Sequence, residues 1–139
     1  MSVKFTDNSG KVLASLERAE RNGLVAIGMT AERYAKHTIT DYSAVDTGRL
    51  RNSITYAISG EEAAVDSYSD NVGNNYQYEG KAPDDTKKAV YIGTNVEYGP
   101  YVELGTSRMA ARPFLRPAAT EHGEEYKGIM EAAMKSADG

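Results

Sequence analysis

Residues 11–38 read KVLASLERAERNGLVAIGMTAERYAKHT, and this stretch decides the fold. Its apolar side chains recur at steps of three and four residues, which is the spacing of one face of a helix. The apolar positions are Leu13, Leu16, Leu24, Ile27, Ala31 and Tyr34. The pattern predicts a long N-terminal helix that Asn8 or Ser9 caps at its start. Gly23 and Gly28 each weaken a helix by about 1 kcal/mol relative to alanine, so we expect a bend or a close packing contact at one of them.

A turn follows the helix. Residues 41–48 are rich in turn formers, and Asp46, Thr47 and Gly48 are interpreted as a structural turn motif. The triplet Asp-Thr-Gly also occurs in aspartic proteases, but the hydrophobic flanks of that motif are missing here. A capped tight turn explains these residues fully.

Short strands are predicted in the middle of the chain. Residues 50–58 are rich in β-forming side chains that alternate in size, which predicts a half-buried strand ending at Gly60. Residues 61–67 are expected to continue the hairpin, and residues 89–94 predict another short strand. The polar, Asn-rich residues 66–88 predict a long mobile loop. Its tyrosines, Tyr68, Tyr76 and Tyr78, are either stray surface residues or a partner surface.

Two further helices are predicted near the C-terminus. Residues 97–104 favour one or two helical turns that stop at Gly105. Residues 105–116 form a connector, and Pro117 is well placed as the first residue of a last helix reaching about residue 136. The chain is therefore expected to be a single α+β domain over residues 1–139. It would hold a small antiparallel sheet, a long N-terminal helix, a short middle helix and a C-terminal helix.

Composition narrows the classes of function. The 139 residues include ten tyrosines, no tryptophan and no cysteine, which excludes a disulfide framework and thiol catalysis. The formal net charge of −4 argues against strong non-specific nucleic-acid binding. No apolar stretch approaches a secretory signal or a membrane span, so we expect synthesis in the cytoplasm and no membrane partner.

Few residues offer catalytic chemistry. The two histidines, His37 and His122, belong to no metal-ligand or nucleophile spacing, and His122 is interpreted as a core or interface residue. We therefore expect no enzyme activity, no metal and no cofactor. A hydrolase that combines either histidine with Asp46 is the weakest alternative.

An arginine-rich connector stands out in this acidic chain. Residues 105–116 carry Arg108, Arg112 and Arg116 and no acidic residue. The planar guanidinium group binds carboxylate or phosphate bidentately, so these arginines favour pairing within the chain or between subunits, or else phosphate contacts. Phosphate contacts would give the alternative function, a nucleic-acid-binding module that uses these three residues with Arg49 and Arg51.

Two segments together resemble a known family. Residues 45–54 read VDTGRLRNSI, and residues 91–106 read YIGTNVEYGPYVELGT, followed by ARPFLRPA at 111–118. Their order and spacing resemble the gp10-like family of phage HK97, the small tail-completion or head–tail joining proteins of long-tailed phages and prophages. That family often has proline where Ala44 stands, and residues 66–85 match none of its motifs.

The resemblance implies a structural protein of the virion neck or tail, made in the bacterial cytoplasm. Its expected partners are further copies of itself in a ring, with a hexamer as the expected form, and neighbouring tail-terminator, tail-tube or head-connector proteins. Interfaces favour tyrosine and arginine. The candidate subunit or partner contacts are Tyr68, Tyr76, Tyr78, Tyr98, Tyr101, Glu103, Arg108, Arg112, Phe114 and Arg116.

Overall fold

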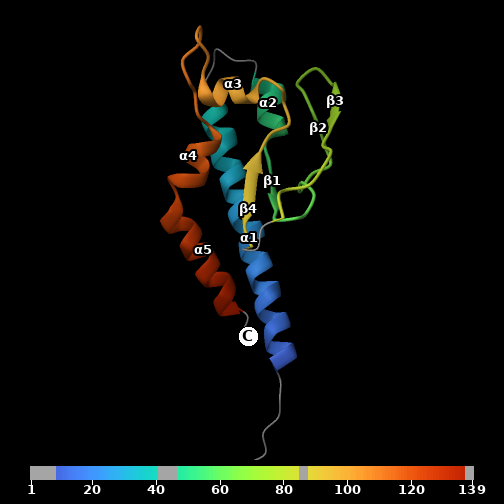
Figure 1. Ribbon diagram of the computed structural model, residues 1–139, viewed down its shortest axis with the longest axis vertical. Helices are drawn as coiled ribbons and strands as arrows, with labels where there is room; N and C mark the ends of the chain where they lie inside the picture. Colours follow the sequence, from blue (N-terminus) through green and yellow to red (C-terminus); the bar gives the residue numbers. More distant parts are fainter. Residues whose placement is uncertain (1–8, 41–46, 85–87, 137–139) are drawn as a thin grey trace, which may run out of the picture.

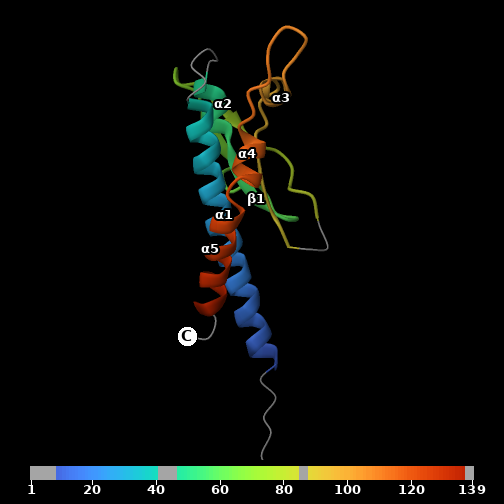
Figure 2. The same ribbon diagram turned by 90° about the vertical axis from the view of Figure 1, so that its left-hand side faces the viewer.

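The chain folds as five helices and two small antiparallel sheets in the computed structural model, which describes residues 9–40, 47–84 and 88–136 (Figure 1). The α+β class predicted from the sequence is confirmed. The long helix α1 (Ser9–Thr40) runs the length of the molecule, and α5 (Gly123–Lys135) lies beside it (Figures 1 and 2). The strands and the shorter helices gather around the C-terminal half of α1.

Gly23 and Gly28 of α1 are positions of close packing. An added Cβ at Gly28 would lie 2.6 Å from the ring of Tyr56, and one at Gly23 would lie 2.6 Å from Sδ of Met130. The sheet and α5 therefore approach the helix backbone more closely than a side chain would permit. This confirms the expected close contact, and both glycines make one.

The main sheet pairs β1 (Thr55–Ile58) with β4 (Val90–Gly93). The predicted strand is correct from residue 55 onward, and Gly60 ends it with a φ of 73°. Residues 50–53 are not extended, however, because they belong to helix α2 (Thr47–Ser53). Leu50, Ser53 and Ile54 have the i, i+3, i+4 spacing of a helix face, and all three are buried, as expected for a helix that packs on the core. The candidate turn is therefore a helix start at Thr47 and Gly48, and Asp46 lies outside the described residues.

The predicted loop contains a hairpin of β2 (Ser67–Ser69) and β3 (Asn75–Gln77). Asp70 closes its turn, because Oδ1 accepts the backbone N–H groups of Val72 at 3.0 Å and Asn74 at 2.9 Å. The expectation of an irregular loop throughout this region was wrong, since an Asx-type turn supplied the local order. That the segment is mobile in the free subunit stays a prediction.

The last helical region is two helices, not one. The short helix α4 (Leu115–Thr120) holds Pro117 within its first turn, and His122 then leaves the helical conformation before α5 begins. The break places the His122 ring flat against Tyr34 of α1, with 3.6 Å between the ring centroids. The break leaves His122 at a corner between α4 and α5 instead of on a continuous helix face.

The hydrophobic core lies where α1, α2, β2, α4 and the segment after β4 meet. Its largest fully buried side chains include Phe114, Ile39, Leu50 and Ile54. Within the part of the chain that the structure describes, no helix is long and apolar enough to cross a bilayer.

Candidate interaction surface

The helix α3 (Gly99–Leu104) and residues 105–113 occupy the end of the molecule opposite the C-terminus (Figures 1 and 2). Two large side chains of α3 are exposed, Tyr101 at 58% and Leu104 at 77%, whereas Val102 on the other side of the helix is buried. We call Tyr101, Leu104 and the exposed Arg108 the α3 surface. It combines apolar area with a positive charge, which is the composition of many protein interfaces.

The loop after α3 is held in a defined shape. Gly105 has a φ of 79°, and its N–H donates to the Tyr101 carbonyl at 2.8 Å. The Thr106 hydroxyl accepts the N–H groups of Arg108 at 3.2 Å and Met109 at 3.1 Å. The chain then returns to α3, where the Arg112 N–H donates to the Val102 carbonyl at 2.7 Å. The α3 surface is therefore carried on an internally bonded loop.

Glu103 lies on α3 but acts on α4. One carboxylate oxygen accepts the N–H groups of Phe114 at 3.1 Å and Leu115 at 2.7 Å, and the other accepts that of Arg116 at 3.3 Å. These N–H groups stand at the start of α4, where the helix dipole favours a negative charge. The motif glutamate thus joins the two segments that carry the family resemblance.

The three arginines of the connector differ in exposure. Arg108 and Arg116 are exposed, and Arg112 is half-buried. In residues 9–40, 47–84 and 88–136, none of the three forms an ion pair. Since Glu103 is engaged by the start of α4, the positive charge of this end of the molecule is left available to a neighbour.

Arg49 behaves differently, because it pairs within the chain. Its two terminal nitrogens donate to the two carboxylate oxygens of Glu97, each at 3.0 Å, and its guanidinium lies 4.2 Å from the centroid of the Tyr76 ring. Backbone hydrogen bonding at Glu97 and the ion pair with Arg49 lower the pKa of Glu97. The same ion pair raises the pKa of Arg49.

The loop tyrosines pack together against the core. Tyr68 is buried at 8% exposure, and its ring lies 5.3 Å from that of Tyr76 and 5.4 Å from that of Tyr78. The Tyr78 hydroxyl is buried with no hydrogen-bond partner among the described residues, and burial raises the pKa of Tyr78. The three tyrosines anchor the hairpin to its own domain. The sequence did not predict this, because residues 66–88 have no periodic pattern of core residues.

The candidate contacts therefore divide into three groups. Phe114 is fully buried, Tyr68 is nearly so, and Glu103 is bonded internally, so these three hold the fold together. Four residues are half-buried and pack against the core or the loop after α3: Tyr76, Tyr78, Tyr98 and Arg112. Tyr101, Arg108 and Arg116 are exposed, and their role as contacts stays a prediction. Sequence reasoning missed Leu104, although its i, i+3 spacing from Tyr101 places both on the face opposite Val102.

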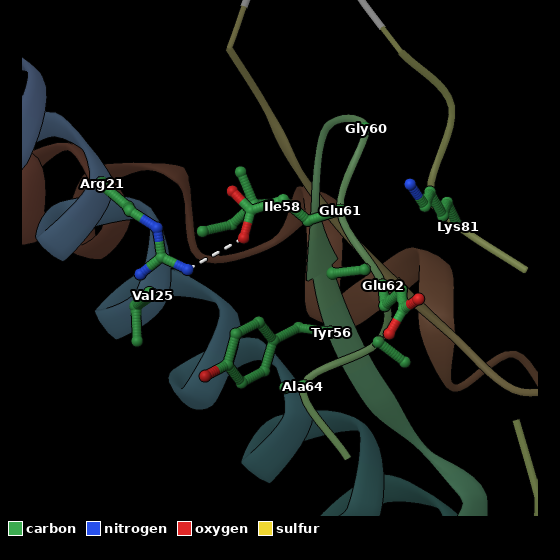
Figure 3. A pocket seen from close by; sticks show the side chains of 11 residues that line it. Arg21, Val25, Tyr56, Ile58, Gly60, Glu61, Glu62, Ala64 and Lys81 are labelled. Carbon is green, nitrogen blue, oxygen red and sulfur yellow. Dashed lines mark hydrogen bonds and ion pairs between the residues drawn. The ribbon is translucent and has the colours of Figure 1, made fainter. Parts of the chain in front are cut away.

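A separate cleft of about 610 Å³ opens between α1 and the end of β1 (Figure 3). Arg21 reaches Glu61, with Nη2 and Oε1 2.8 Å apart, and Tyr56 is among the residues that line the cleft. Glu62 and Lys81 line the other side, so charges of both signs surround the cleft. It holds no histidine and no cysteine among its described lining residues, and its charges do not select a ligand of one sign.

His122 lies in an aromatic contact between α1 and the start of α5. His122 stacks on Tyr34, and the Tyr34 hydroxyl donates to Glu125, which raises the pKa of Tyr34. Over the described ranges, no three His, Asp or Glu side chains gather closely enough to hold a metal ion. Comparison of the chain with protein-family models, curated proteins and solved structures finds no match.

Proposed function

We propose that this chain is a structural subunit of a long-tailed phage or prophage, which assembles at the neck to complete the tail or join it to the head. The observation that carries the proposal is the α3 surface. Leu104 at 77% exposure and Tyr101 at 58% stand on a helix that Gly105, Thr106 and Arg112 fix in place. An apolar surface held this firmly suits a contact with another protein.

The internal roles of the motif residues support the same proposal. The segment 45–54 supplies Leu50, Ser53 and Ile54 to the core, and the segment 111–118 supplies Phe114. Glu103 of the middle motif then bonds the start of α4. The residues that carry the resemblance are thus the ones that position the α3 surface.

Nucleic-acid binding receives less support. Arg49, which that alternative requires, forms an ion pair with Glu97 and stacks on the ring of Tyr76. The remaining exposed arginines lie in a chain of net charge −4. A phosphate backbone needs several unpaired cations along one surface.

The proposal is tested in the phage or prophage that encodes the chain. An early stop codon should yield separate heads and tails, or abnormal tails, in electron micrographs of the lysate. Wild-type protein supplied from a plasmid should restore infectious particles, and Leu104→Asp should not. A matched control, Val72→Asp, changes an equally exposed apolar residue on the hairpin and should restore them. Normal infectious particles from the stop-codon strain would overturn the proposal.

A further inference from the structure

The sheet of β1 and β4 has an inner face against α1 and an outer face on its other side. Tyr56 points to the inner side, because its ring contacts Gly28 of α1. Successive side chains of a strand alternate between the two faces, so Thr55 and Ala57 point to the outer side. These two residues and the segment 78–83 line a cleft of about 360 Å³. A cleft of this volume can hold a small molecule.

Gly93 leaves a gap in the outer face. It lies opposite Thr55 in the sheet, and residues directly opposite each other share a face. Its φ is not positive, and nothing of the described chain lies within 4 Å of a Cβ built there. A glycine in a strand weakens the strand and often marks a place where a ligand approaches the backbone closely. The gap gives the cleft room directly beside Thr55.

Two hydroxyl groups of the cleft lining are buried without a partner. Thr55 is 4% exposed, and its Oγ1 has no hydrogen-bond partner among the described residues. The Tyr78 hydroxyl is the second such group. Across residues 9–40, 47–84 and 88–136, the only other buried side-chain atom without a partner is Nε of Arg49. A buried hydroxyl that lacks a partner has lost its hydrogen bonds to water, which favours a ligand that replaces them.

The rest of the lining selects a neutral molecule with apolar surfaces. The rings of Tyr78 and Tyr91 line the cleft beside the small side chain of Ala57. Its charged residues, Glu79 and Lys81, are both exposed and have opposite signs, so they favour neither an anion nor a cation. Aromatic rings have negative faces, which attract the C–H groups of a saturated ring. A ring that carries both C–H faces and hydroxyl groups therefore matches the tyrosines and the unpartnered hydroxyls together.

We propose that this cleft binds a neutral saccharide unit, with a sugar hydroxyl bonded to Oγ1 of Thr55 and the sugar ring seated over Gly93. An apolar molecule of the same size would leave the buried hydroxyls without partners. The site shares no residue with the α3 surface, so it goes beyond the assembly role proposed above and stands or falls independently of it.

Nuclear magnetic resonance titration of the isotope-labelled protein tests the site. The probes are methyl glucoside, methyl galactoside and N-acetylglucosamine, and 2-methoxytetrahydropyran is the matched ring without hydroxyl groups. At least one sugar should give saturable shifts of the amide signals of Thr55, Ala57 and Gly93. The ring without hydroxyl groups should bind at least about tenfold more weakly, because it cannot bond to Thr55. The proposal is overturned if no sugar gives saturable shifts, if the shifts lie elsewhere in the chain, or if the hydroxyl-free ring binds equally well.

Two substitutions locate the contact, and a third is the control. Thr55→Val keeps the shape of the side chain but removes its hydroxyl, so sugar binding should weaken about tenfold while the urea midpoint stays equal or rises. Gly93→Ala adds a methyl group that meets no described atom, so the protein should fold and bind the sugar more weakly. Gly128→Ala on α5 also adds a methyl group at an open position and should bind like the wild type. Wild-type affinity in either Thr55→Val or Gly93→Ala would overturn the proposal.

Discussion

The carboxylate of Glu103 accepts the backbone N–H of Leu115 at 2.7 Å, which ties helix α3 to the first residue of helix α4. The same carboxylate also accepts the N–H groups of Phe114 and Arg116. Without it, the start of α4 would have no side-chain acceptor, since Phe114 at the N-cap makes no capping bond of its own.

Glu103→Ala should therefore lower the free energy of unfolding by about 1–2 kcal/mol, as loss of a helix cap does. Glu103→Gln keeps one acceptor oxygen and should lose less. Urea denaturation followed by circular dichroism measures both. Glu79→Ala changes an exposed carboxylate after β3 and should leave the midpoint unchanged. Equal midpoints for Glu103→Ala and the wild type would show that the three hydrogen bonds contribute nothing to the free energy of unfolding.

Gly23 and Gly28 of α1 should respond differently to alanine. Gly28→Ala drives a methyl group into Cγ and Cβ of Tyr56, which the sheet holds in place, and should cost about 1–3 kcal/mol. Gly23→Ala meets the flexible end of Met130, so the gain in helix propensity of about 1 kcal/mol should offset the displacement. Thermal unfolding of the two variants, side by side, checks the difference. A larger loss for Gly23→Ala would contradict it.

Tyr78 should make stability fall at high pH. Burial raises its pKa above the ordinary value of 10.0, so the neutral phenol is favoured in the folded state. That contribution is fully present below pH 10 and is lost as the pH rises from 10 toward the folded-state pKa. Tyr78→Phe removes the ionisable group, and its stability should decline less steeply above pH 10 than that of the wild type.

At pH 7 the same variant should be as stable as the wild type or slightly more stable, because it removes a buried hydroxyl that lacks a partner. Urea midpoints at pH 7 and at several alkaline values provide the measurement. Tyr101→Phe, whose ring is 58% exposed, is the matched control. Identical alkaline slopes for wild type and Tyr78→Phe would refute the prediction.

Arg49→Lys should lower the unfolding midpoint at neutral pH, because lysine can reproduce neither the two bonds to Glu97 nor the stacking on Tyr76. The pKa of Glu97 is lowered in the folded state, so the pair stabilises above the ordinary carboxyl pKa of 4.5 and loses this effect as the pH falls through the lower folded-state value. The midpoints of variant and wild type should therefore converge in acid. Arg51→Lys, at an exposed position two residues later in α2, should match the wild type throughout.

Periodic patterns made the helices and strands predictable wherever one face is buried. The three- and four-residue spacing of α1 and the alternation of residues 54–58 both correspond to real elements. Residues 50–53 were mistaken for part of the strand because they directly precede the β-forming residues 54–58, whereas burial of Leu50 and Ser53 on one helical face decides otherwise. The break at His122 depends on a partner ring 88 positions earlier in the sequence, at Tyr34, and no local pattern reveals such a contact.

The sequence predicted which types of residue form the candidate surface, but not which of them are exposed. Tyrosine and arginine drew attention to the right segments, but long-range packing decides which of them are exposed. Glu103 could be identified as a motif residue, yet its bonds to Leu115 and Arg116 arise only after α3 and α4 are brought together. The exposure of Leu104 follows only from the packing of α3, which buries Val102 instead.

The packing of α5 also sets an order of events in solution. Since none of its residues is fully buried, α5 can detach from α1 at a lower free energy than that of global unfolding. Amide hydrogens of α5 should then exchange by local opening, while those of the α1 segment around Ala35 and Ile39 exchange only when the whole domain unfolds. On folding, the core should then form first and α5 should dock onto α1 last.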